Sequence, residues 1–241
     1  MIDVFYVLGS GSKWKNNELR YSLRSLEKYC KNVGQVYVIG ENPGFLSDKV
    51  KYIKATDIGS PACNHWYKVK RFFVETGLDK GCYMMDDIFF IKDTDLENYP
   101  YYYNRELPDY KCSDPNVYHR TLRNTRNELL KRKLPTKSFE VHCPIIYEKD
   151  KFQSLEKDFL HFKSKYKPFV GVRTFYCAMN GINGKFCDDM KIRGNHINDW
   201  QERIKSNDCF SISDDVIKMG VGDWLEKEFP NPSKYEKTPQ K

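Results

Sequence analysis

The sequence predicts an α/β fold in which a mainly parallel sheet is flanked by helices within a single domain. Apolar strand patterns and helical patterns alternate from the first residues onward, which is typical of parallel strands joined by crossover helices. The length of 241 residues suits one such domain. The composition, 40% hydrophobic and 30% charged, is that of a globular chain that can bury a sizeable core.

Apolar runs define the predicted strands, apolar residues spaced by three or four define the helices, and clusters of Gly, Pro and Asn mark the turns. Asn42-Pro43-Gly44 stops the second strand, and the stripe Trp66, Val69 and Phe72 defines the second helix. In order, the predicted elements of the amino-terminal half are a strand over 2–8, a helix over 16–29, strands over 35–40 and 50–53, a helix over 64–76, and a strand over 81–85 that continues over 88–91.

The carboxy-terminal half is less regular. Residues 96–115 are rich in Tyr and Pro and read as a loop, and 171–182 is a mixed segment punctuated by Gly. The predicted domain spans 1–229, and the tail 230–241, which has Pro, Lys and few apolar residues, is expected to be partly mobile. The other predicted elements are a basic helix over 121–132, a strand over 139–147, a helix over 151–165, a strand over 209–212 and a helix over 222–229.

The charge and the cysteines indicate a compartment and a class of partner. The formal net charge of +7 favours an anionic partner such as a nucleotide, a nucleic acid or an anionic polysaccharide, although a solvated surface would also explain it. No apolar stretch approaches the length of a membrane span, and no signal peptide precedes the first strand. None of the eight cysteines forms a Cys-x-x-Cys pair, so we expect free thiols in the cytoplasm and no zinc site.

Two adjacent carboxylates, Asp86 and Asp87, directly follow the apolar run over 81–85, and apolar residues resume at Ile88. In an open α/β sheet, ligands bind beyond the carboxyl ends of the strands. Carboxylates placed there can hold a divalent cation that in turn binds the phosphates of a nucleotide. The alternative is a surface turn with two solvated acids. Apolar chain on both sides favours the metal-binding role.

The first strand and the loop after it form a second candidate ligand site. Asp3 lies inside an apolar strand, where a carboxylate needs a partner. Gly9, Ser10 and Gly11 would let the backbone approach a ligand closely. An ordinary strand–helix turn is the alternative, because the loop lacks the Gly-Lys-Ser/Thr of a phosphate-binding loop.

Three further positions carry chemistry. His142 could deprotonate an acceptor hydroxyl or help to bind a metal, or it could be a structural strand histidine. Asp214 and Asp215 follow the strand over 209–212 as the first acidic pair follows its strand, and a helix N-cap is the alternative role. Arg173 lies among apolar and aromatic residues, so it needs an anionic partner, either a diphosphate or a structural carboxylate.

A basic stretch around residues 119–133 could lie on the backbone of a polyanion. A solvated helix face is the alternative interpretation. The residues that would contact phosphates are Arg120, Arg123, Arg126, Arg132 and Lys133.

Several blocks of this sequence resemble the Stealth-type sugar-phosphate transferases, which include capsular polysaccharide phosphotransferases and the eukaryotic N-acetylglucosamine-1-phosphotransferase. The blocks follow the family's order from one end of the chain to the other. The opening blocks are 2–6 and 17–29, the central block is 83–90, His142-Cys143-Pro144 is similar to a His-x-Pro element, and 209–215 with 229–236 is similar to the closing block. The chain looks closer still to compact bacteriophage proteins labelled as glycosyltransferases.

The resemblance implies a GT-A-like, Rossmann-like fold, a UDP-sugar donor and a Mn or Mg ion. The implied donor or metal residues are Asp3, Asp86, Asp87, Arg173 and Asp214, to which we add Arg20 of the second opening block as a donor-binding residue. His142 would be an active-site residue. The sequence departs from the family where Met85 and Ser213 replace Asn and where Lys13 replaces Asp. Transfer of a sugar and transfer of a sugar-1-phosphate therefore both remain open.

We predict a cytoplasmic, metal-dependent UDP-sugar transferase, located in the host cytoplasm if the protein is viral. Its catalytic residues would be His142, Asp87 and Asp214, and its metal ligands Asp86, Asp87 and Asp214. The net charge slightly favours hydroxymethylated bases of double-stranded bacteriophage DNA as the acceptor. Glycosyl or sugar-1-phosphate transfer to a capsule or surface polysaccharide is the first alternative. An inactive nucleotide- or glycan-binding module is the second.

Overall fold

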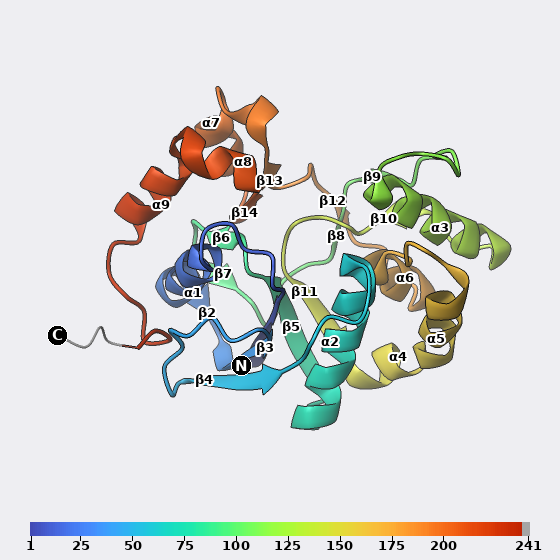
Figure 1. The fold of residues 1–241 in the computed structure, drawn as a ribbon, viewed down its shortest axis with the longest axis horizontal. Helices are drawn as coiled ribbons and strands as arrows, with labels where there is room; N and C mark the ends of the chain where they lie inside the picture. Colours follow the sequence, from blue (N-terminus) through green and yellow to red (C-terminus); the bar gives the residue numbers. More distant parts are fainter. Residues whose placement is uncertain (238–241) are drawn as a thin grey trace.

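The computed structural model describes residues 1–237 and has a five-stranded central sheet with the strand order β11-β5-β1-β3-β4 (Figure 1). Four of its strands are parallel, and β11 runs antiparallel to β5 at one edge. The bounds are β1 Ile2–Leu8, β3 Val33–Gly40, β4 Val50–Lys54, β5 Lys80–Met85 and β11 Ile145–Glu148. The predicted single α/β domain with a mainly parallel sheet is confirmed.

Helices cover both faces of this sheet because β1 is apolar on both of its sides. Val4 and Tyr6 pack on the face that carries α1 (Asn17–Tyr29). Phe5 points to the opposite face, where its ring stacks at 4.0 Å on Phe72 of α2 (Pro61–Thr76). The helix α2 begins three residues earlier than predicted because Pro61, whose fixed φ suits a first turn, starts it.

A second, three-stranded sheet continues directly from the first. The strand β6 (Ile88–Phe90) follows β5 after only two residues and pairs antiparallel with β14 (Cys209–Ile212), which pairs parallel with β13 (Lys191–Ile192). Phe89 and Phe210 fill a separate core beneath this sheet. The elements around that core are η1 Gly194–His196, α7 Trp200–Lys205, α8 Asp214–Val216, η2 Ile217–Val221 and α9 Gly222–Glu228.

The other side of the molecule is helical and rich in aromatic side chains. Its helices are α3 Val117–Lys131, α4 Lys149–Gln153, α5 Glu156–Lys165 and α6 Val172–Met179. Short paired strands connect the layers: β2 Cys30–Lys31 with β7 Thr94–Asp95, β8 Tyr102–Tyr103 with β12 Lys185–Phe186, and β9 Arg105–Glu106 with β10 Lys137–Ser138.

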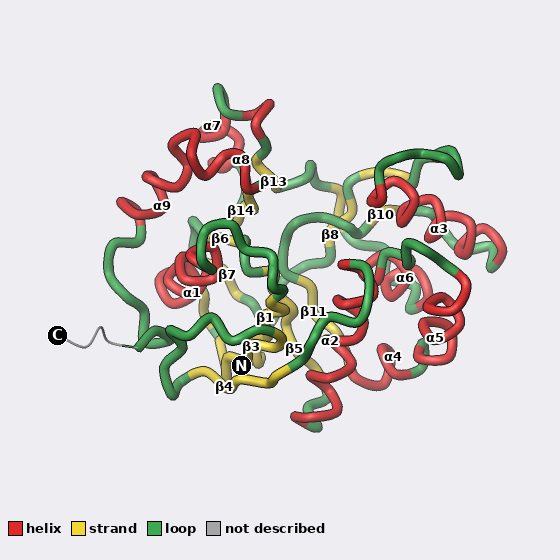
Figure 2. The backbone as a smooth tube through the Cα atoms, viewed as in Figure 1, coloured by secondary structure: helices red, strands yellow, loops and turns green. Residues whose placement is uncertain are grey.

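Three predicted segments differ from the structure. The strand expected over 139–147 is a loop as far as Pro144, and only β11 is extended (Figure 2). The helix expected over 151–165 is two helices, α4 and α5, and the mixed segment 171–182 contains the buried helix α6. Every residue of α6 from Val172 to Ala178 is buried, Arg173 and Thr174 included, and a segment of eight residues is too short for a helical repeat to stand out.

The carboxy-terminal residues as far as Lys237 are held against the first helix rather than left loose. Glu236 is buried and accepts hydrogen bonds from Arg20 and Arg24, while Lys237 N donates to Phe45 O. The predicted mobility of residues 238–241 lies outside the described residues. No helix within residues 1–237 has the length and apolar character to cross a bilayer. All eight cysteines are free thiols, as predicted.

Candidate active site

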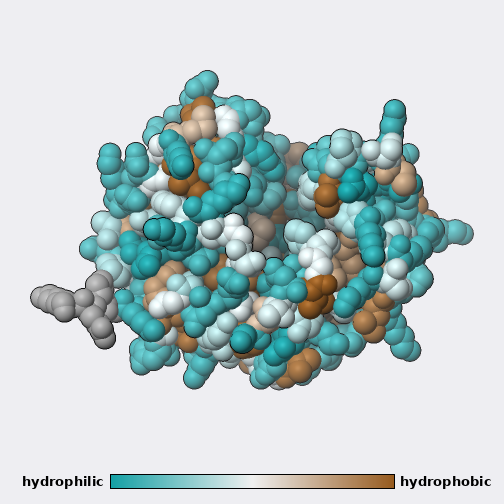
Figure 3. Space-filling view, viewed as in Figure 1, coloured by the Kyte–Doolittle hydropathy of each residue, from teal (hydrophilic) through white to brown (hydrophobic). Residues whose placement is uncertain are grey.

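The carboxyl ends of the four parallel strands lie along one edge of the central sheet, and the polar residues that follow them gather there. Gly9 to Ser12 follow β1, Glu41 follows β3, Asp57 comes shortly after β4, and Asp86 with Asp87 follows β5. The surface is hollowed between the two sides of the molecule (Figure 3). Two cavities, of about 550 Å³ at the ends of β3 and β4 and about 490 Å³ beside the end of β5, open along this edge.

Asp86 and Asp87 occupy the two positions between β5 and β6, where the chain passes from one sheet to the other. Pairing of β6, β14 and β13 sets the neighbours of Asp87: Ser211 lies opposite Ile88, and Lys191 lies opposite Ser211. Consequently Ser211 Oγ donates to Asp87 Oδ2 at 2.7 Å, and Lys191 Nζ lies 3.2 Å from the same oxygen. The second sheet therefore fixes the Asp87 carboxylate.

A third carboxylate, Glu18 in the first turn of α1, belongs to the same group and was missed from the sequence. Burial, together with the charges of Asp87 and Glu18, raises the pKa of Asp86 to about 7. Burial also raises the pKa of Glu18, with Asp214 and Asp87 adding to the shift, although Ser12 Oγ donates to its Oε2 at 2.9 Å. The site thus concentrates negative charge that lacks a sufficient counter-charge.

Asp214 stands at the rim of this group. Its side chain is 49% exposed and lies 3.2 Å from the ammonium of Lys13. Its neighbour Asp215 accepts from Gly194 N at 3.0 Å and so ties η1 to the start of α8. Neither residue caps α8 through its own side chain, because Ser213 holds the N-cap position. Asp214 could therefore contribute to the predicted metal site only from the edge of the acidic group.

We tested whether these carboxylates fit the predicted Mn or Mg ion. Within residues 1–237, no group of three or more His, Cys, Asp and Glu side chains is arranged to hold a metal by itself. Mg²⁺ in nucleotide-binding enzymes is commonly held by one or two carboxylates together with the phosphates of the substrate. Asp86 and Asp87 fit that mode, and the pKa of Asp86 is raised first by burial and then by the neighbouring negative charges, both of which a bound cation would offset.

The cavity at the ends of β3 and β4 is polar and is shaped by a buried lysine that the sequence analysis did not single out. Lys68 of α2, only 1% exposed, donates to Leu8 O at 2.7 Å and to Asp57 Oδ1 at 2.6 Å. Gly40 has φ +136°, and a Cβ there would overlap Leu8 O, so only glycine fits this turn. Ser10 lines the cavity beside these residues, and both Ser10 and Gly11 are exposed.

The second cavity carries the predicted histidine together with a partner. His142 Nδ1 lies 2.7 Å from Asp189 Oδ1, and Arg193 donates to the other oxygen of Asp189 at 2.8 Å. Burial opposes ionisation of Asp189, but the bonds from His142 and Arg193 prevail and hold its pKa well below the ordinary range. Asp189 was not predicted, since nothing in its local sequence links it to His142, 47 residues away.

Arg173 lies in the first turn of α6, is 3% exposed and lines the same cavity. Its Nη1 donates to Val141 O and to Cys143 O, and its guanidinium faces the ring of Tyr83 at 5.0 Å. Within residues 1–237 no carboxylate lies within ion-pair distance of it, so the structural carboxylate considered from the sequence is not found. The partners of Arg173 within the described residues are two backbone carbonyls and an aromatic ring.

Two residues predicted to bind the donor lie elsewhere. Asp3 is at the amino end of β1, far along the strand from Gly9, and its carboxylate accepts from Gln35 N at 2.8 Å. Arg20 faces the carboxy-terminal segment, where it pairs with Glu236 at 2.8 Å and lies over the ring of Phe45. We therefore remove Asp3 and Arg20 from the candidate site. The partner of the half-buried Asp3 carboxylate is a backbone amide.

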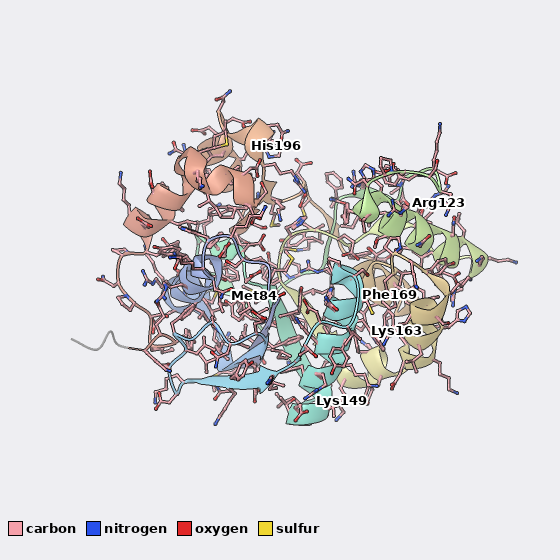
Figure 4. The ribbon with its side chains drawn as sticks, viewed as in Figure 1. Met84, Arg123, Lys149, Lys163, Phe169 and His196 are labelled. Atoms are coloured by element: carbon pink, nitrogen blue, oxygen red, sulfur yellow. The ribbon has the colours of Figure 1, made fainter. Side chains whose placement is uncertain are left out.

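The predicted basic stretch is largely engaged within the protein. Arg120 donates to Asp114 O, Arg126 lies 3.4 Å from Asp109, and Arg132 pairs with Glu128 and Asp158. Arg123 on α3 and His196 in η1 mark opposite sides of the hollow (Figure 4). Lys133 follows α3 in the left-handed region, with φ 56°. The five residues do not form one continuous stripe of uncommitted cations.

A scan against models of known protein families finds no match to this chain, and a search of curated proteins finds no relative.

Proposed function

We propose that this protein is a GT-A-type transferase that moves a sugar from a UDP-sugar donor bound together with a Mn or Mg ion. The observation that carries the proposal is the placement of Asp86 and Asp87. They lie where the central sheet passes into the second sheet, directly after Met85, which lines the cavity of about 490 Å³. Ligands of open α/β sheets bind at this edge.

The polar cavity near Asp57 and Lys68 suits the nucleoside part of the donor, and the cavity beside His142 suits the sugar acceptor. Asp86 and Asp87 would hold the metal, which would stabilise the charge of the departing diphosphate. With the Nδ1 proton held by Asp189, His142 presents Nε2 to the acceptor hydroxyl. The acceptor oxygen bonds to the anomeric carbon, its proton passes to His142, and UDP leaves with the electrons of the broken bond.

The acceptor cavity of about 490 Å³ has the size of a small-molecule or sugar site. We therefore favour a compact hydroxyl acceptor, such as the end of a saccharide. Hydroxymethylated DNA as the acceptor stays a prediction. It has less support because Arg126 and Arg132, two of the residues expected to contact DNA phosphates, form ion pairs within the protein. Sugar-1-phosphate transfer is separated from sugar transfer by the product, because the first releases UMP and the second UDP.

The test compares UDP binding and turnover in the wild type, Asp87→Asn and a matched control, Asp93→Asn, which neutralises an exposed aspartate paired with Lys31. With Mn²⁺ present, we expect UDP affinity to fall at least tenfold in Asp87→Asn and to stay within twofold in the control. Hydrolysis of UDP-sugars should fall in parallel. Equal UDP affinity in all three proteins, or in excess chelator, would refute the proposal; UDP binding without turnover on a panel of sugars and acceptors would favour the inactive binding module.

A further inference from the structure

The buried guanidinium of Arg173 is not fully used by the protein. One of its terminal nitrogens, Nη1, bonds two backbone carbonyls, whereas Nη2 is buried and has no hydrogen-bond partner within the described chain. Leaving a charged donor buried and unpaired is costly. Burial opposes the charge, yet the surrounding tyrosines, Cys143 and Glu140 keep the pKa of Arg173 above its ordinary value, so the group is a cation.

Three helices begin at the cavity that Arg173 lines, namely α2, α3 and α6. Two of these starts are occupied by the protein: Asn116 Oδ1 accepts from the first turn of α3, and Glu140 Oε1 accepts from Thr174 N of α6. No side chain among residues 1–237 caps α2, which begins at Pro61. The amides of its first turn and the positive end of its dipole therefore remain available.

The charges around the cavity agree with an anionic ligand. His65, stacked on Tyr83, is neutral because burial and the charge of Arg173 lower its pKa well below the ordinary value. Glu140 is the one carboxylate in the described lining, and its Oε1 is committed to Thr174 N. Arg173, which has no ion-pair partner among the described residues, and the uncapped start of α2 thus line the same cavity of about 490 Å³.

We propose that this cavity binds an anionic group of the acceptor, of the phosphate type, between Arg173 and the first turn of α2. Phosphate suits both partners, since helix starts and arginine side chains are its common binding groups. The role as acceptor site rests on the proposed function. The binding of the anion does not, because it can be measured without nucleotide.

The experiment places an acid in the cavity. Ala62, in the first turn of α2, lines the cavity, so Ala62→Asp puts a carboxylate where the anion would lie. Leu160→Asp adds the same charge at a half-exposed position of α5 outside the cavity. Inorganic phosphate is the probe, titrated by calorimetry against the full chain. We expect Ala62→Asp to weaken phosphate binding at least tenfold and Leu160→Asp to leave it within twofold of the wild type.

A second variant, Arg173→Lys, keeps the positive charge but loses the forked donor geometry. Its phosphate affinity should fall at least threefold while UDP–Mn²⁺ still binds, which reports a folded protein. Phosphate binding that is absent in the wild type, or equal in the wild type and Ala62→Asp, would overturn the proposal whether or not Arg173→Lys folds.

Saturation with UDP and Mn²⁺ distinguishes the source of the anion. The proposal requires phosphate to bind the UDP-saturated protein within twofold of its affinity for the free protein. Competition between UDP and phosphate would assign Arg173 to the donor diphosphate and overturn the acceptor role. Phosphate binding in a protein that fails to bind UDP would instead refute the proposed transferase and leave the anion site in place.

Discussion

At the scale of single residues, the pair formed by His142 and Asp189 has the geometry of a base and the group that orients it. The 2.7 Å contact fixes the imidazole through Nδ1, and Arg193 in turn holds Asp189. Such an arrangement keeps the other ring nitrogen available to a substrate. Asp189 is therefore a positioning residue in the proposed reaction.

Asp189→Asn should lower kcat at least tenfold with little change in KM, because it disturbs the base without removing a substrate contact. His142→Asn should cost more, within the ~10²–10⁴-fold that general base catalysis commonly supplies. An unchanged kcat in Asp189→Asn would leave Asp189 with a structural role alone.

The position of a residue could be predicted where it directly follows a strand. Asp86 and Asp87 follow β5, as the apolar run before them indicated. Glu18 and Asp189 could not, because each meets its partners only through the fold: Glu18 reaches the acidic group through the turn of α1, and Asp189 reaches His142 from a distant loop. Asp3 misled the prediction because its backbone partner, Gln35 N, lies on the neighbouring strand.

At the scale of elements, α3 and α5 are joined through one buried carboxylate, Glu128. It accepts from Lys131 and Arg132 of its own segment and from Lys165 and Tyr166 beyond it. Although burial opposes ionisation, these bonds hold the pKa of Glu128 well below its ordinary value of 4.5. Part of the basic stretch that suggested a polyanion-binding surface therefore neutralises the buried carboxylate of Glu128.

Glu128→Gln should destabilise the protein by about 2 kcal/mol at pH 7, in the range measured for hydrogen bonds to charged groups. A carboxylate whose pKa is lowered by folding stabilises above its unfolded pKa and loses that contribution as pH falls through the folded value. The difference from wild type in urea unfolding should therefore shrink as the pH is lowered from 5 to 3.

Glu75→Gln is the matched control for this measurement, because Glu75 forms an exposed i,i+4 pair with Arg71. Its effect should stay below about 0.5 kcal/mol at both pH values. If the free energy of unfolding of Glu128→Gln differs from that of the wild type as much at pH 3 as at pH 5, the charge of Glu128 does not stabilise the contact between α3 and α5.

Elements were predictable where both faces of a strand or one face of a helix is apolar, as in β1 and α1. They were not predictable where tertiary contacts decide. The apolar run before β11 stays a loop, and Arg173 binds two carbonyls in it, Val141 O and Cys143 O. Those carbonyls are therefore not free to pair with a neighbouring strand. The local sequence pattern does not reveal this.

At the scale of the whole molecule, the carboxy-terminal segment fastens the first helix to the rest of the fold. The Glu236 carboxylate is fully buried and meets Arg20 at 2.8 Å and Arg24 at 2.7 Å. Ser233 N also donates to it, at 2.8 Å. The tail 230–241 was expected to be partly mobile, since its few apolar residues gave no sign of burial.

Glu236→Gln leaves two partly buried arginines without their charge partner, so we expect a loss of about 3 kcal/mol. Differential scanning calorimetry should show a melting temperature lower by roughly 6–12 °C for a chain of this size. Glu202→Gln, which breaks an exposed i,i+3 pair with Lys205, should change the melting temperature by less than about 2 °C. Equal melting temperatures for Glu236→Gln and Glu202→Gln would contradict a fastening role.

The fastening by Glu236 also has a consequence for biosynthesis. Glu236 is translated 212 residues after Arg24, so the arginines of the first helix leave the ribosome long before their carboxylate exists. Until then these guanidinium groups have only water as a partner for their charge. The final locking of the first helix therefore waits until Glu236 has left the ribosome.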